Sequence, residues 1–275
     1  MTITTSPRPA VAPRRLAGRA PLAFRAYQYN LLSYKRTWRG SLTTTFLYPV
    51  LYLAAMGEGL GHLIKHGSST AVEGLPYIWF LAPGLLAGTA MQIGANEATF
   101  PVMAGIKWLK TYLAMLATPL EVTDVLYGHL LWILTRIATA AGVFLGVMAA
   151  FGIVPSPWAL LAFPAAILTG AAFAAPVMAF SATRDTDQSF VVLYRFGIVP
   201  LFLFSGTFFP VSQLPGWLQV VARCTPLYHG VTLCRAFVLG RPGGWDSVAH
   251  GAYLLVMFAG GVLAGRVTYR RRLVR

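Results

Sequence analysis

Apolar runs of about 20 residues recur along the whole chain, and no other feature of the sequence constrains the fold as strongly. A helix rises about 1.5 Å per residue, so each run is long enough to cross roughly 30 Å of hydrocarbon. Hydrophobic residues make up 56% of the 275 positions and charged residues only 11%, whereas charged residues make up about a quarter of a soluble domain. A soluble fold is therefore excluded, and the sequence predicts an all-α integral membrane protein.

Polar and proline-rich breaks divide the chain into six predicted transmembrane helices. Their approximate limits are 41–61, 77–95, 127–151, 158–181, 189–209 and 248–265. Pro200 falls within the fifth span, where the missing N–H predicts a kink. We find no internal repeat in the sequence.

Basic residues gather at the two ends of the chain and predict its orientation. Eight Lys and Arg residues, from Arg8 to Arg39, precede the first span without one acid, and five Arg residues, from Arg266 to Arg275, follow the last. Lys and Arg mark cytoplasmic flanks, so both termini are expected in the cytosol of a multi-pass protein of the cell membrane. The net charge of +14 does not indicate a nucleic-acid partner, because most of the chain is not solvated.

Composition suggests three parts of the chain. Residues 1–20 lack the apolar core of a signal peptide and are predicted to be a disordered cytosolic arm. Residues 21–40 mix aromatic and basic side chains, which predicts an N-terminal helix lying in the membrane interface. A simple extension of the first span is the alternative for that segment. Residues 41–275 would form the six-span domain.

The longest predicted cytosolic loop, residues 96–125, is expected to contain short helices of its own. Within it, Thr118 is predicted as a helix N-cap, with Pro119 at the first helical position and Glu121 at the third. Glu121 and Asp124 are three residues apart and would share one face of that helix. Negative charge in the first turn suits the helix dipole, which explains Glu121 without a partner. For Asp124 a partner cation is the expectation.

Few side chains in the predicted spans could carry chemistry. Glu58 lies near the outer end of the first span, where it either lines a polar path or extends its carboxylate to the outer interface. Arg136, in the third span, is expected to pair with Glu97 or to extend to the inner interface. The five histidines show no metal-ligand spacing, so no metal site is predicted. Cys224 and Cys234 are compatible with a disulfide or with two free thiols.

The sequence also lacks a nucleotide-binding loop. No lysine follows a glycine, so the Gly-Lys-Ser/Thr that cradles phosphates is absent. No cofactor is therefore predicted in this chain. If transport is driven by ATP, another chain must supply the ATPase.

Two segments resemble the type 2 permeases of ABC exporters, and most closely the nodulation-type branch related to lipo-oligosaccharide and drug exporters. The first runs over residues 200–219 (PLFLFSGTFFPVSQLPGWLQ) and continues at 225–235 (TPLYHGVTLCR). Its signature residues are Phe204, Ser205, Gly206, Phe208, Phe209, Pro210, Leu214 and Pro215. The second, residues 114–120 (AMLATPL), lies where that family places a coupling helix.

The resemblance implies a transport subunit that is not itself an enzyme. It would form a homodimer or pair with a paralogous permease, and would dock on two copies of a cytosolic ABC ATPase that binds ATP and Mg²⁺. The residues expected to form the cytosolic coupling helix are Thr118, Pro119, Leu120, Glu121, Thr123 and Asp124. The substrate would be an amphipathic molecule, such as a lipo-oligosaccharide, a lipid-linked glycan or a hydrophobic drug, that leaves the cytosol or the inner leaflet.

Residues 210–239 are expected to form an external re-entrant hairpin. Prolines divide its apolar residues into pieces too short to cross about 30 Å of hydrocarbon, so the segment should enter and leave by the same face. Backbone N–H and C=O groups at that depth need hydrogen-bond partners within the protein. The turns are therefore expected at Gly206 and Pro215.

Two other classes of protein remain as alternatives. A secondary transporter or channel would be expected to show paired carboxylates or broken repeats within the membrane. A membrane-embedded enzyme would need a convergent set of His, Asp, Glu or Cys at one depth. The sequence shows neither pattern.

Overall fold

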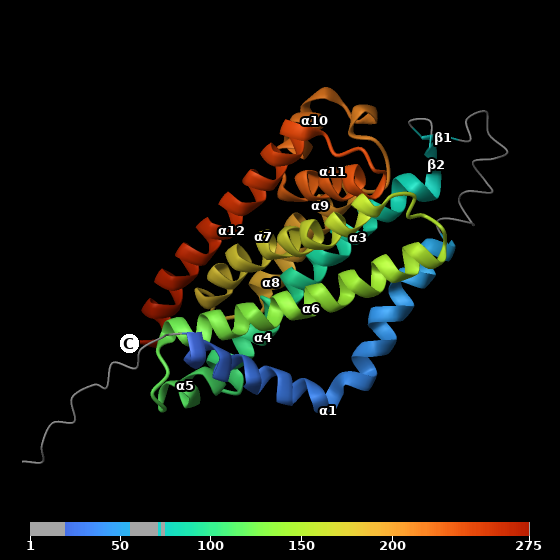
Figure 1. The fold of residues 1–275 in the computed structure, drawn as a ribbon. Helices are drawn as coiled ribbons and strands as arrows, with labels where there is room; N and C mark the ends of the chain where they lie inside the picture. Colours follow the sequence, from blue (N-terminus) through green and yellow to red (C-terminus); the bar gives the residue numbers. More distant parts are fainter. Residues whose placement is uncertain (1–19, 56–70, 73–74, 275) are drawn as a thin grey trace, which may run out of the picture.

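The computed structural model describes residues 20–55, 71–72 and 75–274, and nearly all of them are helical (Figure 1). The predicted arm therefore lies outside the described residues, apart from Ala20, and so does Glu58. The α-helices are α1 (Ala20–Tyr52), α3 (Tyr77–Glu97), α4 (Phe100–Met103), α5 (Thr111–Leu116), α6 (Val122–Ala150), α7 (Ala162–Ala182), α8 (Gln188–Leu193), α9 (Val199–Phe204), α10 (Gly216–Arg223), α11 (Pro226–Val238) and α12 (Gly244–Leu273). Two strands of two residues each, β1 (Ala71–Val72) and β2 (Leu75–Pro76), pair antiparallel just before α3.

Four helical segments of the described chain are long and apolar enough to cross a membrane. They are Tyr77–Trp108, Val122–Ala150, Pro157–Ala182 and Gly244–Leu273, and they coincide with the second, third, fourth and sixth predicted spans. The fifth is shorter than predicted, because its apolar helix runs from Gln188 to Phe204 and a turn at Gly206 follows. A π-helical turn, Tyr194–Ile198, precedes Pro200, at the place where the sequence predicted a kink.

Helix α1 continues through the predicted boundary between an interfacial helix and a first span. It is hydrogen-bonded from Ala20 to Tyr52 and bends sharply along its length (Figure 1). Its first half lies along α6, where Gly128 allows close approach: a Cβ at that glycine would lie 2.5 Å from the Ala26 Cβ. The two predicted parts are thus one bent helix in the structure.

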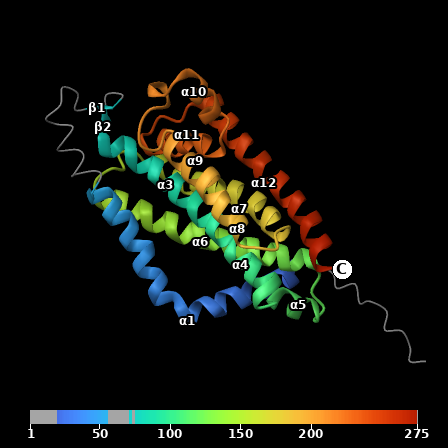
Figure 2. The same cartoon turned by 180° about the vertical axis from the view of Figure 1, so that it is seen from behind.

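Helices α3 and α7 form the centre of the molecule and contain 14 and 15 buried residues (Figures 1 and 2). Small residues let their neighbours approach closely. A Cβ at Gly94 of α3 would lie 2.4 Å from the Gly170 carbonyl oxygen of α7, and one at Gly261 of α12 would lie 2.4 Å from the Pro176 ring. A Cβ at Gly230 of α11 would similarly meet Thr169 of α7.

Helix α12 extends well past its predicted limits of 248–265. Its last turns contain Arg270, Arg271 and Arg272, and positive charge near a helix C-terminus is favourable to the helix dipole. The helix therefore continues beyond the apolar run, which was the only feature used to place the span.

Candidate functional site

Two regions at opposite ends of the molecule contain the predicted coupling residues and the signature residues. At one end, α5 and the start of α6 lie beside the last turns of α12 (Figure 1). A cavity of about 1350 Å³ opens there, with Leu120, Glu121 and Asp124 on one wall and Arg266, Arg270 and Arg271 on the other. We call this region, residues 104–127 and 266–274, the coupling end.

The predicted helix start at Thr118 is wrong. The Thr118 hydroxyl donates to the Met115 carbonyl at 2.6 Å, so it closes the end of α5 instead of capping a following helix. Residues 117–119 form a turn, and the next helix is the long span α6, beginning at Val122. Thr118 and Pro119 therefore belong to a connection, and the short helix of this loop is α5, which precedes them.

Glu121 is the N-cap of α6, and Asp124 completes the cap. The Glu121 backbone N–H donates to Asp124 Oδ2 at 2.9 Å, in the reciprocal arrangement of a capping box. The Asp124 side chain is buried, with 2% of its surface exposed. Asp124 thus stabilises the start of α6, and this replaces the expectation that it faces a partner cation.

Three large apolar side chains are exposed just before the connection. Trp108 and Leu109 end a π-helical turn and Leu113 lies on α5, with 52%, 71% and 44% of their surfaces exposed. Lys110, between the two helical pieces, has a positive φ of 53°, which is unusual for a residue other than glycine. The sequence analysis missed this apolar surface because it searched the loop for helix starts and acids.

Buried aromatic residues connect the coupling end to the spans. The Tyr112 ring of α5 lies 5.9 Å from the His129 ring of α6 and 6.0 Å from the Tyr269 ring of α12, measured between centroids. Burial raises the pKa of Tyr112, so its hydroxyl stays neutral. A force on α5 would therefore pass directly to α6 and α12.

The loop between α7 and α8 is also joined to this end of the molecule. Lys107 Nζ donates to the Asp185 carbonyl oxygen at 2.7 Å, and Arg272 of α12 forms an ion pair with the Asp185 carboxylate. Asp185 thus links the segment before α5 to the end of α12.

The predicted pairing of Arg136 with Glu97 is confirmed. Arg136 Nε lies 3.2 Å from Glu97 Oε1, Arg136 Nη1 donates to the Tyr34 hydroxyl at 2.8 Å, and Trp132 Nε1 donates to Glu97 Oε2 at 3.3 Å. The network joins α1, α3 and α6. A structural role therefore accounts for both charges.

The second region is the hairpin of α10 and α11, at the end opposite α5 (Figure 1). Gly206 turns the chain after α9 with a positive φ of 82°, a conformation that favours glycine. The Tyr77 hydroxyl of α3 donates to the Phe208 carbonyl oxygen at 3.2 Å, and the Ser205 and Thr225 hydroxyls are 3.0 Å apart. Gly206 thus lies in a turn, as predicted, whereas Pro215 is an extended residue that begins α10 as its N-cap.

The remaining residues of the signature pack around this turn. Phe208 contacts Phe202 edge to face with 5.1 Å between centroids, and Phe204 lies 6.5 Å from Phe209. Pro210 and Leu214 bracket a short 3₁₀ turn, Val211–Gln213. The signature thus describes how the chain leaves α9 and enters α10.

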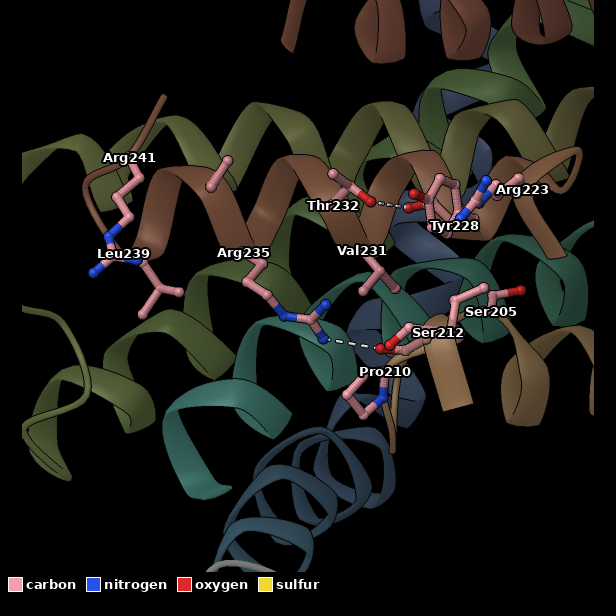
Figure 3. Close-up of a pocket in the computed structure, with 13 residues that line it drawn as sticks. Ser205, Pro210, Ser212, Arg223, Tyr228, Val231, Thr232, Arg235, Leu239 and Arg241 are labelled. Carbon is pink, nitrogen blue, oxygen red and sulfur yellow. Dashed lines mark hydrogen bonds between the residues drawn. The ribbon is translucent and has the colours of Figure 1, made fainter. Parts of the chain in front are cut away.

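A cavity of about 400 Å³ lies between this turn and α11. Arg223 and Tyr228 line one end of it, Leu239 and Arg241 line the other, and Arg235 lies between them (Figure 3). We call it the hairpin pocket. None of its lining residues is acidic.

Arg235 is the most constrained of these arginines. Its Nη2 donates to the Gly206 carbonyl oxygen at 2.9 Å and to the Phe80 carbonyl oxygen at 3.2 Å, and its guanidinium carbon lies 3.8 Å above the Phe80 ring. The side chain thus fastens α11 to α3 and to the signature turn.

A feature of the sequence could have revealed the pocket. From residue 188 to residue 245 the chain contains four arginines and no acid, and three of the four flank or lie within the hairpin. What the sequence could not show is that α11 and the turn at Gly206 bring them around one cavity.

Two of the histidines that are scattered along the sequence meet in the structure. His229 Nδ1 of α11 lies 2.6 Å from His250 Nδ1 of α12, and the His229 ring stacks on Tyr253 with 4.0 Å between centroids. Burial, and then the neighbouring His250, lowers the pKa of His229 to about 4, so this ring is neutral near pH 7. Among the described residues no group of three or more His, Cys, Asp or Glu side chains could bind a metal ion. Cys224 and Cys234 are both free thiols.

The sequence profile of the ABC-2 type transporter family matches residues 23–239. Nodulation protein J of Rhizobium meliloti (strain 1021) is 34% identical over 217 residues, which cover 78% of this chain and 80% of that protein. Nodulation protein J of Rhizobium leguminosarum bv. viciae is 32% identical over 250 residues, 90% of this chain and 94% of the relative. A daunorubicin resistance ABC transporter permease protein of Streptomyces coeruleorubidus is 31% identical over 118 residues, 40% of this chain and 39% of its own length.

Proposed function

The chain belongs to the ABC-2 type transporter family, and on that premise we propose that it is the membrane-spanning permease of an ATP-driven exporter of amphipathic molecules. The observation that carries the proposal is the family match over residues 23–239, which runs from α1 to the end of α11. The match includes most of the coupling end and every residue that lines the hairpin pocket except Arg241. Both regions therefore lie mainly within the part of the chain that matches the family.

The family implies a separate ATP-binding subunit, and the missing Gly-Lys of a nucleotide-binding loop agrees with that requirement. In our proposal two copies of this cytosolic ATPase bind ATP and Mg²⁺ and perform the hydrolysis. The permease itself would be a homodimer or would pair with a paralogous permease. This chain would contribute transport and no catalysis.

The proposed topology has six spans with both termini in the cytosol. The four long apolar helices are four of them, the segment from Gln188 to Phe204 is the fifth, and the second half of α1 with the residues that follow is the first. The hairpin, residues 210–239, would then lie at the external side, and Glu58 would lie near the outer end of the first span. The cation bias of the chain ends supports this orientation.

The coupling contact should be centred on the exposed apolar surface of Trp108, Leu109 and Leu113. Large apolar side chains carry most of the free energy of a protein interface, whereas exposed ion pairs contribute about 0–1 kcal/mol each. Leu120 and Glu121, at the adjoining cavity, would complete the surface. This moves the centre of the proposed contact from the predicted helix at Thr118 to α5 and the turn before it.

The double substitution Leu109→Asp, Leu113→Asp tests this contact. Both side chains are largely exposed in the single chain, so the variant should insert and fold normally. We expect it to lose most of its co-purification with the ATPase and at least tenfold of its substrate-stimulated ATP hydrolysis, since each charge would be buried at the interface.

The matched control is Leu160→Asp, an equally exposed leucine in the 3₁₀ turn at the other end of α6. It should retain full ATPase binding. If the Leu109 and Leu113 variant binds and stimulates the ATPase like the wild type, these residues are not the coupling contact.

The substrate class is tested with inverted membrane vesicles that contain the chain and its ATPase. We expect ATP-dependent uptake of a hydrophobic drug or a lipid-linked glycan, abolished when the ATPase cannot hydrolyse ATP. Uptake that follows an ion gradient and is indifferent to the ATPase would instead identify a secondary transporter or channel.

A further inference from the structure

The hairpin pocket is lined by arginines, and no acidic side chain in the lining balances their positive charge. Arg223 and Arg241 line it, and neither forms an ion pair with any residue in the described part of the chain. Within the described part of the chain, the Arg223 guanidinium donates one long hydrogen bond, 3.5 Å from Nη2 to Gln219 Oε1. Two arginines without a countercharge in a concave site favour an anionic ligand.

Arg235 presents a third guanidinium in a fixed position. It donates hydrogen bonds to the carbonyl oxygens of Phe80 and Gly206, and one face of it packs on the Phe80 ring. A planar guanidinium held in this way is preorganised for an oxyanion, since binding costs it little additional rotamer entropy.

The three arginines are too widely spaced to surround one small ion. Helix α11 has 13 residues and is about 20 Å long, with Arg223 before it and Arg241 after it (Figure 3). Between them the wall is largely apolar, with Val231, Ala236 and Leu239. The pocket therefore suits an elongated ligand that has both an anionic group and an apolar part.

Helix α10 offers a place for that apolar part. Trp217, Val220 and Val221 recur at helical spacing on its outer face, and 71%, 64% and 54% of their surfaces are exposed. The helix ends at Arg223, on the rim of the pocket. Its apolar face thus lies on the helix that leads to the pocket rim, as in a helix that lies among acyl chains with its charge at the headgroups.

We propose that the hairpin pocket binds the oxyanion headgroup of an acidic amphiphile, a phosphate ester on an apolar chain, with its chain along α10. The inference concerns binding alone and does not depend on which substrate the exporter moves. A membrane phospholipid and free phosphate share the anionic chemistry, and the measurements below distinguish them.

The test uses the full-length chain purified in a neutral detergent. Binding of dihexanoyl phosphatidic acid, dihexanoyl phosphatidylcholine and inorganic phosphate is followed by tryptophan fluorescence and native mass spectrometry. We expect saturable binding of the phosphatidic acid, with phosphatidylcholine and inorganic phosphate each at least tenfold weaker. Substituting Arg223→Gln, where α10 meets the pocket, should weaken phosphatidic acid binding about tenfold, as expected for the loss of one charge-assisted contact. Arg241→Gln, at the far end of the pocket (Figure 3), should weaken binding less, because its charge acts on the headgroup only from a distance.

Two control variants separate this site from the general positive charge of the chain. Arg195→Gln removes an exposed arginine that does not line the pocket, and Arg270→Gln removes one at the coupling end. Both should bind phosphatidic acid like the wild type. Equal weakening in all four variants, or no weakening in the two pocket variants, would overturn the proposal, as would inorganic phosphate that binds as tightly as the lipid.

Discussion

At the scale of single residues, the ion pair of Glu97 with Arg136 gives two largely buried charges a structural partner. Glu97 and Arg136 pair within the bundle, with 20% and 18% of their side-chain surfaces exposed. Tyr34 and Trp132 complete their hydrogen bonds. A charge inside a membrane protein persists when it is paired, and this pair fastens α1 to the spans.

We expect Arg136→Met to lower the free energy of unfolding by about 1–3 kcal/mol, because the Glu97 carboxylate would remain partly buried without its cation. The double variant Glu97→Gln, Arg136→Met should lose less than the single variant, since no uncompensated charge remains. Unfolding in detergent, followed by circular dichroism, measures both values. A double variant that is less stable than Arg136→Met would contradict this account.

At the scale of elements, close helix crossings depend on glycines. Helices α3 and α7 meet where Gly94 faces the Gly170 carbonyl, and this crossing lies at the centre of the bundle. Without a hydrophobic driving force between helices in lipid, such contacts supply van der Waals packing. The crossing therefore determines how near the other helices can come.

Gly94→Ala should destabilise the protein by about 1–3 kcal/mol, because the added methyl overlaps backbone that cannot move aside. Gly146→Ala in α6 is the matched control, since nothing lies within 4 Å of its Cβ position. It should be neutral or stabilising by up to about 1 kcal/mol through helix propensity. The two thermal unfolding midpoints in detergent should therefore move in different directions. Similar losses would show that packing at the crossing is not the cause.

At the scale of the whole molecule, the coupling end and the hairpin pocket lie at opposite ends of the same bundle (Figures 1 and 2). Helices α6 and α12 extend along the bundle from the coupling end toward the other side. Aromatic contacts join them to α5, and the His229–His250 contact joins α12 to α11. A displacement at the coupling end can therefore reach the hairpin through α12.

The proposed topology makes a separate prediction. Reporter fusions after Gly67 and after Gly243 should report the external side, and fusions after Lys110 and after Arg275 the cytosol. Cysteine substitutions at Gln213 and Arg241 should both react with an impermeant reagent added from outside. An external C-terminus, or labelling of either hairpin position only from the cytosol, would refute the six-span arrangement.

Much of the fold follows from the sequence because the membrane makes local composition decisive. Apolar length predicted the ends of α3, α6 and α7 to within about five residues but missed the C-terminal end of α12. Prolines predicted the breaks around α10 and α11. The ion pair of Arg136 with Glu97 could also be predicted from the sequence, because two opposite charges within an apolar bundle have few other partners.

The sequence by itself therefore determined the class of protein, the main spans and the family, since these depend on composition and on motifs that are continuous along the chain. Tertiary structure decided that α6 begins after Glu121 and not after Thr118. Alternative N-caps differ in free energy by only about 1 kcal/mol, and the packing of neighbouring residues contributes more than that. Tertiary structure also decided that Arg223, Arg235 and Arg241 share one pocket and that His229 meets His250. Contacts of that kind depend on how α11 packs against α3 and α12, and no local pattern in the sequence specifies this.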